Sequence, residues 1–257
     1  MSKSKDGIET VSKIYEDGLK SSVQESGKVL SLIPKTISAA LSPLRKWIAQ
    51  REYNVAETEK LLALKLEKIN ADFIVSPEPY IAVPALQAIS YCDNSEDLRN
   101  MYANLLASSM RVDKKQDVHP SYVEIIKQLS PDEAKLLKKI SEGSGSYPLI
   151  DVRLCLSNDG GYHVHVQNFT LLAEGVCEYP ERVYEYLDNL SRLKIIDIPY
   201  GVFLNSDEVY EPLESNIKIQ NLIKSEVREG DTWKIDRKKF EITQFGEGFI
   251  KTCVVGK

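Results

Sequence analysis

The stretch EPYIAVPALQAISYCDNSEDLRNMYANLLASSM (residues 78–110) and its continuation VHPSYVEIIKQLSPDEAKLL (residues 118–137) decide the fold that this chain can adopt. Prolines and helix-capping residues alternate here with apolar residues at helical spacing. Pro84 can open a short helix, and Asp93 or Asn94 can cap the helix that follows. The region therefore predicts a helical scaffold, and it contains no catalytic motif.

Two further helices follow from the capping residues and the apolar spacing. The helix after Asn94 has acidic residues in its first turn, which suits the positive end of a helix dipole. Ser130, Pro131 and Glu133 form a capping box with proline at the first helical position, so a helix should run from there to about Glu142. The first of these helices should bury one face, made by Leu98, Met101, Tyr102, Leu105, Leu106 and Met110.

Upstream, residues 26–51 combine a purely basic charge with an apolar stripe at helical spacing. This composition is typical of an amphipathic helix that lies on an anionic membrane surface. Pro34 and Pro43 would kink or divide such a helix, and an apolar stripe on a basic helix also packs against acidic helices of the same protein. The candidate residues for contact with a membrane or a partner protein are Lys28, Lys35, Arg45, Lys46, Trp47 and Arg51.

Downstream of Gly143 the pattern changes from helices to a mixture of strands and helices. Residues 147–156 and 162–169 alternate around Asn158-Asp-Gly-Gly, where the glycines can adopt a positive φ. This arrangement predicts a β-hairpin.

The rest of the chain continues in this mixed pattern. Pro180 should open a helix, and residues 195–203 are typical of a strand. Helical spacing returns over residues 210–227, and a β pattern follows over residues 232–243. Thr243 can cap a last helix.

Two segments of this half, LSRLKIID (residues 190–197) and KKFEITQFGEGFIK (residues 238–251), resemble parts of winged-helix domains. In such domains a leucine-rich helix leads into a β-wing, and a T-x-x-G helix closes the unit. The candidate recognition helix, residues 181–194, carries as many acidic as basic residues, so it has no basic face for phosphates. We therefore prefer a wing that contacts another protein or serves packing, and DNA binding is the alternative function. Its candidate contacts are Arg182, Arg192, Lys194, Arg237, Lys238 and Lys239.

No arrangement of residues predicts a metal, a cofactor or a catalytic centre. His163 and His165 lie two apart on a predicted strand with Cys155 and Cys177 on either side, but the spacing matches no known zinc motif. His119 precedes a proline and is expected to satisfy the exposed amides at the start of the next helix. A hidden hydrolase or nuclease would need clustered histidines or carboxylates that the sequence does not display. We therefore predict a protein that is not an enzyme.

The composition is that of an ordinary globular protein, with 42% apolar and 28% charged residues and a net charge of −5. The acidic balance argues against a generally nucleic-acid-binding surface. The four cysteines are irregularly spaced, and no signal-peptide core or long apolar run is visible. These features predict a cytoplasmic protein with reduced thiols, which the basic segment could bring to the inner membrane surface.

Three segments together resemble the bacterial abortive infection alpha (Abi-alpha) family, a domain of unknown molecular function. They are the stretches of residues 78–110 and 118–137 quoted above and the closing segment FEITQFGEGFIKTC (residues 240–253). The resemblance covers about residues 50–255, through separated motifs in the expected order. It implies a bacterial protein with a part in defence against phage, in which the infected cell is stopped before the phage matures. It implies no catalytic residues.

The sequence thus predicts a mainly α protein with an α+β part. A basic amphipathic region (residues 1–50) and a helical domain (51–142) should precede a winged-helix-like domain (143–257). The expected function is antiphage defence through contact with a phage or host protein, with self-association and membrane contact as further possibilities. Tyrosines that could favour such an interface are Tyr179, Tyr184, Tyr186, Tyr200 and Tyr210.

Overall fold

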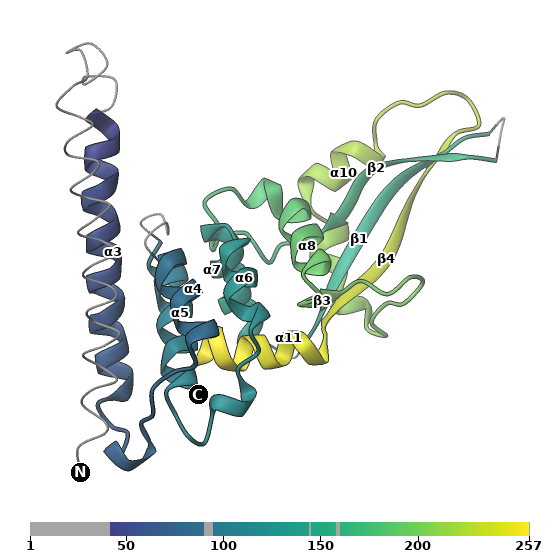
Figure 1. The fold of residues 1–257 in the computed structure, drawn as a ribbon. Helices are drawn as coiled ribbons and strands as arrows, with labels where there is room; N and C mark the ends of the chain where they lie inside the picture. Colours follow the sequence, from purple (N-terminus) through teal and green to yellow (C-terminus); the bar gives the residue numbers. More distant parts are fainter. Residues whose placement is uncertain (1–41, 90–94, 144, 158–159, 257) are drawn as a thin grey trace.

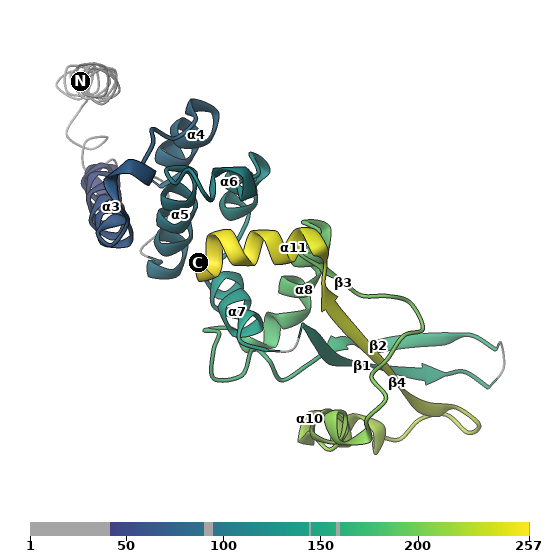
Figure 2. The same ribbon diagram turned by 90° about the horizontal axis from the view of Figure 1, so that it is seen from below.

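The computed structural model of the chain describes residues 42–89, 95–143, 145–157 and 160–256 (Figure 1). The fold is mixed α+β with more helix than strand, as predicted. Helices α3 to α7 form one side of the molecule, and a four-stranded antiparallel sheet with its own helices forms the other (Figures 1 and 2).

The helical side is built around α5, which is buried along most of its length. Helices α3, α4, α6 and α7 all contact α5, and so does the C-terminal turn of the chain. In chain order the elements are α3 (Ser42–Leu66), the 3-10 turn η1 (Ala71–Phe73), α4 (Pro79–Ile89), α5 (Glu96–Ser109), the 3-10 turn η2 (Lys115–Asp117), α6 (Ser121–Lys127) and α7 (Pro131–Ser141).

The start of α4 corrects the prediction that Pro84 opens this helix. Pro84 lies inside α4, which begins five residues earlier at Pro79. The reason is local, because the amides of Ile81 and Ala82 already donate to the Glu78 carbonyl and so complete the first turn.

The caps of α5 and α7 follow from serine side chains. The Ser95 hydroxyl accepts a hydrogen bond from the amide at the third position of α5, so Ser95 is the N-cap. Asp93 and Asn94, the predicted caps, lie outside the described residues. At α7 the capping box is confirmed, since Ser130 and Glu133 each accept a hydrogen bond from the other's backbone amide.

The sheet has the strand order β2-β1-β4-β3, and every neighbouring pair is antiparallel. The predicted hairpin is confirmed, because β1 pairs with β2. The long strand β4 pairs with β1 on one side and with the short β3 on the other. The strands are β1 (Ser146–Cys155), β2 (Tyr162–Phe169), β3 (Ile196–Asp197) and β4 (Thr232–Ile242).

Two predicted elements of this half are shorter than expected. The strand predicted over residues 195–203 is reduced to β3, and the helix predicted over 210–227 is divided in two. The division has a local cause, because the Asn216 side chain accepts from the Lys218 amide and starts a new helix. The remaining elements are η3 (Pro180–Arg182), α8 (Val183–Arg192), η4 (Asp207–Val209), α9 (Glu211–Glu214), α10 (Ile217–Ile223), α11 (Gln244–Phe249) and the π-helical turn η5 (Ile250–Val255).

A single hydrophobic cluster runs through both sides of the molecule. It joins Ile81 and Leu105 of the helical side to Leu149, Phe240 and Cys253 of the sheet side. Helix α11 lies between the two sides (Figure 2), and its Phe249 belongs to the same cluster. The sheet is therefore packed directly on the helices.

A second cluster covers the other face of the sheet. Successive residues of a strand point to opposite faces, so Ile150 and Val152 face away from Leu149. Tyr210, Leu213 and Ile219, from the segment between β3 and β4, pack on them. The described strands β1 and β4 are thus enclosed between two layers.

Candidate interaction surfaces

The basic segment reaches the body of the protein through α3. Lys28 and Lys35 lie outside the described residues, while Arg45, Lys46, Trp47 and Arg51 belong to the first half of α3. In its second half, Val55 and Leu62 pack on the hydrophobic cluster, and Thr58 is buried. Within the part of the chain that the structure describes, no helix is long and apolar enough to cross a membrane.

The candidate DNA contacts of α8 are engaged with neighbouring side chains. Arg182 forms an ion pair with Glu185. Arg192 donates hydrogen bonds to the side-chain oxygens of Gln128 and Asn189. Lys194 is exposed and has a positive φ of 60°, where the chain leaves the helix for β3.

The three candidate DNA contacts on β4 are also paired with acidic groups. Arg237 binds Asp207 and Glu214, and hydrogen bonds to these carboxylates raise the pKa of its guanidinium. Lys239 pairs with Glu241 at 2.6 Å. These ion pairs neutralise positive charge that would otherwise attract the phosphate groups of DNA.

Lys238 belongs to a polar cluster on the sheet. Its ammonium lies 3.0 Å from an Asp151 oxygen and 2.6 Å from Asn168 Oδ1. Asn168 has a positive φ of 53°, and its amide donates to Asp151 Oδ1. The cluster holds β1, β2 and β4 together at the irregular part of the β1–β2 register.

Two histidines and two cysteines have structural roles, at a helix start or in packing. His119 Nδ1 accepts a hydrogen bond from the Ser121 amide, which confirms its predicted role at the start of α6. His165 packs edge-on against Trp233. Burial raises the pKa of the Cys253 thiol and brings that of Cys177 to about 11. No group of three His, Cys, Asp or Glu side chains among the described residues could hold a metal ion.

Among the described residues, Asp132 is the carboxylate whose pKa changes most on folding. It is 5% exposed and accepts hydrogen bonds from the amides of Glu178 and Tyr179, the Tyr186 hydroxyl and Lys135. Burial by itself would raise the pKa of Asp132, but these donors outweigh it and lower the pKa to about 2. Asp132 therefore ties α7 to the chain that enters α8.

Asn104 makes a similar connection on the other side of the core. Its side-chain amide donates to the carbonyls of Cys253 and Val254, at 2.8 and 3.1 Å. These carbonyls belong to the end of η5, where the helix leaves them without partners. Neither contact has a signal in the sequence, since the residues that Asp132 joins to α7 lie 46 or more residues away and Asn104 lies 149 residues from Cys253.

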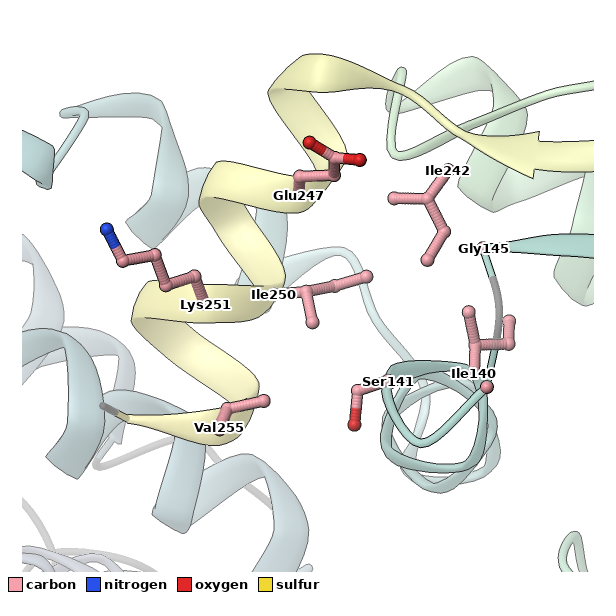
Figure 3. A pocket seen from close by; sticks show the side chains of 9 residues that line it. Ile140, Ser141, Gly145, Ile242, Glu247, Ile250, Lys251 and Val255 are labelled. Carbon is pink, nitrogen blue, oxygen red and sulfur yellow. The ribbon is translucent and has the colours of Figure 1, made fainter.

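An open groove of about 360 Å³ lies between the end of α7 and the α11–η5 helix (Figure 3). Its walls include the apolar side chains of Ile140, Ile242 and Ile250. Lys251, at the rim, is paired with Asp117 at 3.0 Å. Among its polar residues, Ser141 donates its hydroxyl to the Lys138 carbonyl, and Glu247 also lines the groove.

Exposed aromatic side chains gather on the sheet side. Of the five tyrosines proposed for an interface, Tyr186 and Tyr210 are buried in the two clusters. Tyr179, Tyr184 and Tyr200 are exposed. Tyr200 is fully exposed, and Val202 and Phe203 beside it are 40% and 56% exposed, so one short loop carries three exposed apolar side chains.

Similarity to known proteins extends over most of the chain. The family model described as abortive infection alpha matches residues 50–253. No curated protein matches. A solved structure, of an uncharacterized protein from the hydrocarbon-degrading marine bacterium Alcanivorax borkumensis SK2, is 22% identical with a TM-score of 0.33, covering 55% of this chain and 96% of that one. With its residues 50–253 matched, the chain belongs to the abortive infection alpha family.

Proposed function

We propose that this is a bacterial antiphage protein that acts by contact with another protein, without catalysing a reaction. The observation that carries the proposal is the loop of residues 199–203, on which Tyr200, Val202 and Phe203 are exposed together. Aromatic side chains of this kind are enriched where proteins bind one another, and their burial by a partner is favourable. Family membership supplies the abortive infection context.

The loop is held firmly at its base. The Leu204 amide donates to the Tyr210 hydroxyl at 2.8 Å, and this hydroxyl donates to the Lys238 carbonyl at 2.8 Å. Tyr210 itself is fully buried. A loop that is anchored in this way presents its apolar residues with little ordering entropy left to lose on binding.

The test is phage challenge of cells that express the double variant Tyr200→Ser, Phe203→Ser. We expect phage plaques to return to the level of cells without the protein. The matched control is Tyr80→Ser, Val83→Ser, which removes an exposed apolar pair from α4, at 59% and 49% exposure against 102% and 56% for the loop pair. If the loop variant is folded by circular dichroism and still protects like the unchanged protein, this contact surface is wrong.

Membrane engagement by residues 26–51 is a further part of the proposal. The segment is held on the body at rest and is exposed on infection. The attachment of α3 through Val55 and Leu62 supports a tethered segment of this kind. A version that lacks residues 1–41 keeps α3 intact from Ser42, whereas a cut after Arg51 would divide the helix.

Binding to vesicles that contain phosphatidylglycerol separates this part from the rest. We expect the full chain to sediment with such vesicles at low salt, and the version without residues 1–41 to bind less. If neither version binds, the proposed membrane contact is wrong. The loop surface is tested separately, by the phage challenge.

A winged-helix-like arrangement of residues 143–257 is proposed on the order of its elements. After the hairpin of β1 and β2, α8 leads directly into β3, and β4 then lies between β1 and β3 in the sheet. This order supports the alternative function, a DNA-binding regulator. The ion pairs of Arg182, Arg237 and Lys239 argue against it.

DNA binding is tested by gel shift of duplex DNA at several salt concentrations. A true phosphate interface should bind at low salt and weaken steeply as salt rises. We expect no shift even at low salt, because Arg182, Arg237, Lys238 and Lys239 are paired with carboxylates of the protein. A salt-dependent shift that is lost in Arg192→Ala would promote the DNA alternative.

A further inference from the structure

We propose that the open edge of β2 is a self-association surface, at which two copies of this chain pair through their β2 strands in antiparallel orientation. β2 (Tyr162–Phe169) is the outermost strand of the sheet and, among the described residues, pairs only with β1. Its first four residues are exposed. An edge strand of this length presents a row of backbone groups to which another strand can bond.

The backbone groups that point outward can be assigned from the β1–β2 register. The Leu156 amide donates to the Gly161 carbonyl, and Leu154 is opposite His163. Because bonded and non-bonded pairs alternate in an antiparallel ladder, His163 bonds to β1 while Tyr162 and Val164 direct their N–H and C=O groups away from it. These outward groups lie two residues apart, as a second antiparallel strand requires.

The sequence of β2 lacks the charged side chains and prolines that commonly protect an edge. The strand reads YHVHVQNF and contains no lysine, acidic residue or proline. The other edge of the sheet differs, because β3 is only two residues long. Beyond these two residues that edge is formed by β4, which carries Lys234, Asp236 and Arg237, so β2 is the edge without such charged side chains.

A second copy of the same chain fits this edge better than an unrelated peptide would. In a two-fold antiparallel pair each residue faces itself or a near neighbour, so a charged strand would repel its copy across the axis. β2 has no acidic or lysine side chain to cause this repulsion. The pairing also closes on itself, because the edges left outside consist of the short β3 and the charged β4, which protect against further strand addition.

The mass of the full chain in solution, followed by sedimentation velocity, tests the proposal. We expect a monomer that converts to a dimer at concentrations up to about 200 μM, within the range of small interfaces. Val164→Pro should raise the dissociation constant at least tenfold, since it removes an N–H that points outward and spares the bonds to β1. Val164→Lys should do the same by charge repulsion.

Val112→Lys is the matched control, because Val112 is exposed to a similar degree but lies on the helical side after α5, at 42% against 47%. It should dimerise like the unchanged chain. Circular dichroism and thermal unfolding establish that each variant is folded, and Val164→Lys covers the case in which proline disturbs the hairpin. A monomer at every concentration, or a dimer that both Val164 variants leave intact, overturns the proposal. The proposal is independent of the loop surface at residues 199–203.

Discussion

Asp132 acquires its chemistry from residues far along the chain. The backbone amides of Glu178 and Tyr179 and the Tyr186 hydroxyl donate to its carboxylate, and it is hardly exposed. Its position in the first turn of α7 also places it at the positive end of that helix. A carboxylate so fully hydrogen-bonded stabilises the folded state only while it is ionised.

Asp132→Asn should destabilise the protein by about 2–3 kcal/mol at neutral pH. The reason is that an uncharged amide replaces a carboxylate that accepts hydrogen bonds from four donors. The pKa of Asp132 falls from 3.8 to about 2 on folding. Its stabilisation is therefore complete above pH 3.8 and is lost as the pH falls through 2. Urea unfolding between pH 7 and pH 2 should show the difference between unchanged protein and variant shrinking by about 2 kcal/mol.

The control for this prediction is Asp188→Asn on α8, where the carboxylate is exposed. It should change the free energy of unfolding by less than about 0.5 kcal/mol. A pH profile that is the same for Asp132→Asn and for the unchanged protein would contradict the assigned role of Asp132.

Asn104→Ala should loosen the C-terminus. It leaves the carbonyls of Cys253 and Val254 without their donor, at an expected cost of about 1–3 kcal/mol. Hydrogen exchange of the amides of η5 should rise more than that of the sheet. Asn100→Ala, a half-buried position one turn earlier on α5, serves as the control and should leave η5 protected.

At the scale of elements, α11 joins the sheet to the helices through one close approach. The Thr243 hydroxyl caps α11 by accepting from the Gly246 amide at 2.9 Å, and the Thr243 amide donates to the Ile195 carbonyl. A Cβ atom on Gly246 would lie 2.0 Å from the Ile195 oxygen, which is backbone and cannot turn aside. Only glycine lets the start of α11 come this close to the Ile195 carbonyl, which lies between α8 and β3.

Gly246→Ala should therefore cost about 3 kcal/mol or more, since the helix must shift away from the sheet. Gly248→Ala on the same helix is the matched control. There the added Cβ meets the Tyr122 hydroxyl at 2.8 Å, a single side-chain atom and not backbone, so the clash is milder than at Gly246. Thermal unfolding should rank the two variants in this order, and equal destabilisation would show that the approach of α11 to Ile195 is not limiting.

At the scale of the molecule, the change of architecture after residue 143 does not interrupt the core. Leu105 and Leu137 of the helical side share one cluster with Leu149, Ile196 and Phe240 of the sheet side. Neither side would keep its apolar surface covered without the other. The predicted division into residues 51–142 and 143–257 thus describes two architectures, and whether they fold separately is a matter for experiment.

We expect the two sides to unfold in a single transition. In a Trp47→Phe variant the fluorescence of Trp233 reports on the sheet side, while far-ultraviolet circular dichroism is dominated by the helices. The two denaturation curves should have the same midpoint and slope. Separate midpoints would instead support two independently folding domains.

The helices with strong local signals could be predicted from the sequence because their causes lie within a few residues. Ser130 and Glu133 cap α7 through their own turn, and Thr243 does the same for α11. The hairpin also has a local cause in the glycines of its turn. The family could be recognised as well, since its motifs are stretches of sequence.

The short β3, the divided helix after Tyr210 and the inner position of Pro84 could not be read in this way. The first turn of α4 at Glu78 and the Asn216 cap are local causes, but apolar spacing does not record them. The length of β3 depends on its pairing with β4, which extends over only two residues. The candidate cations were found by the sequence, but their acidic partners were not. Asp207 and Glu214, which neutralise Arg237, lie 30 and 23 residues away from it.

By itself the sequence determined the composition, the capped helices, the hairpin and the family, because these follow from residue types and near-neighbour spacing. The tertiary structure alone decided which polar groups are paired, which tyrosines are exposed and which strand forms the open edge. The physical reason is that burial and hydrogen bonding at Asp132, Asn104 and Lys238 join residues far apart in the chain, and no local pattern records such pairs.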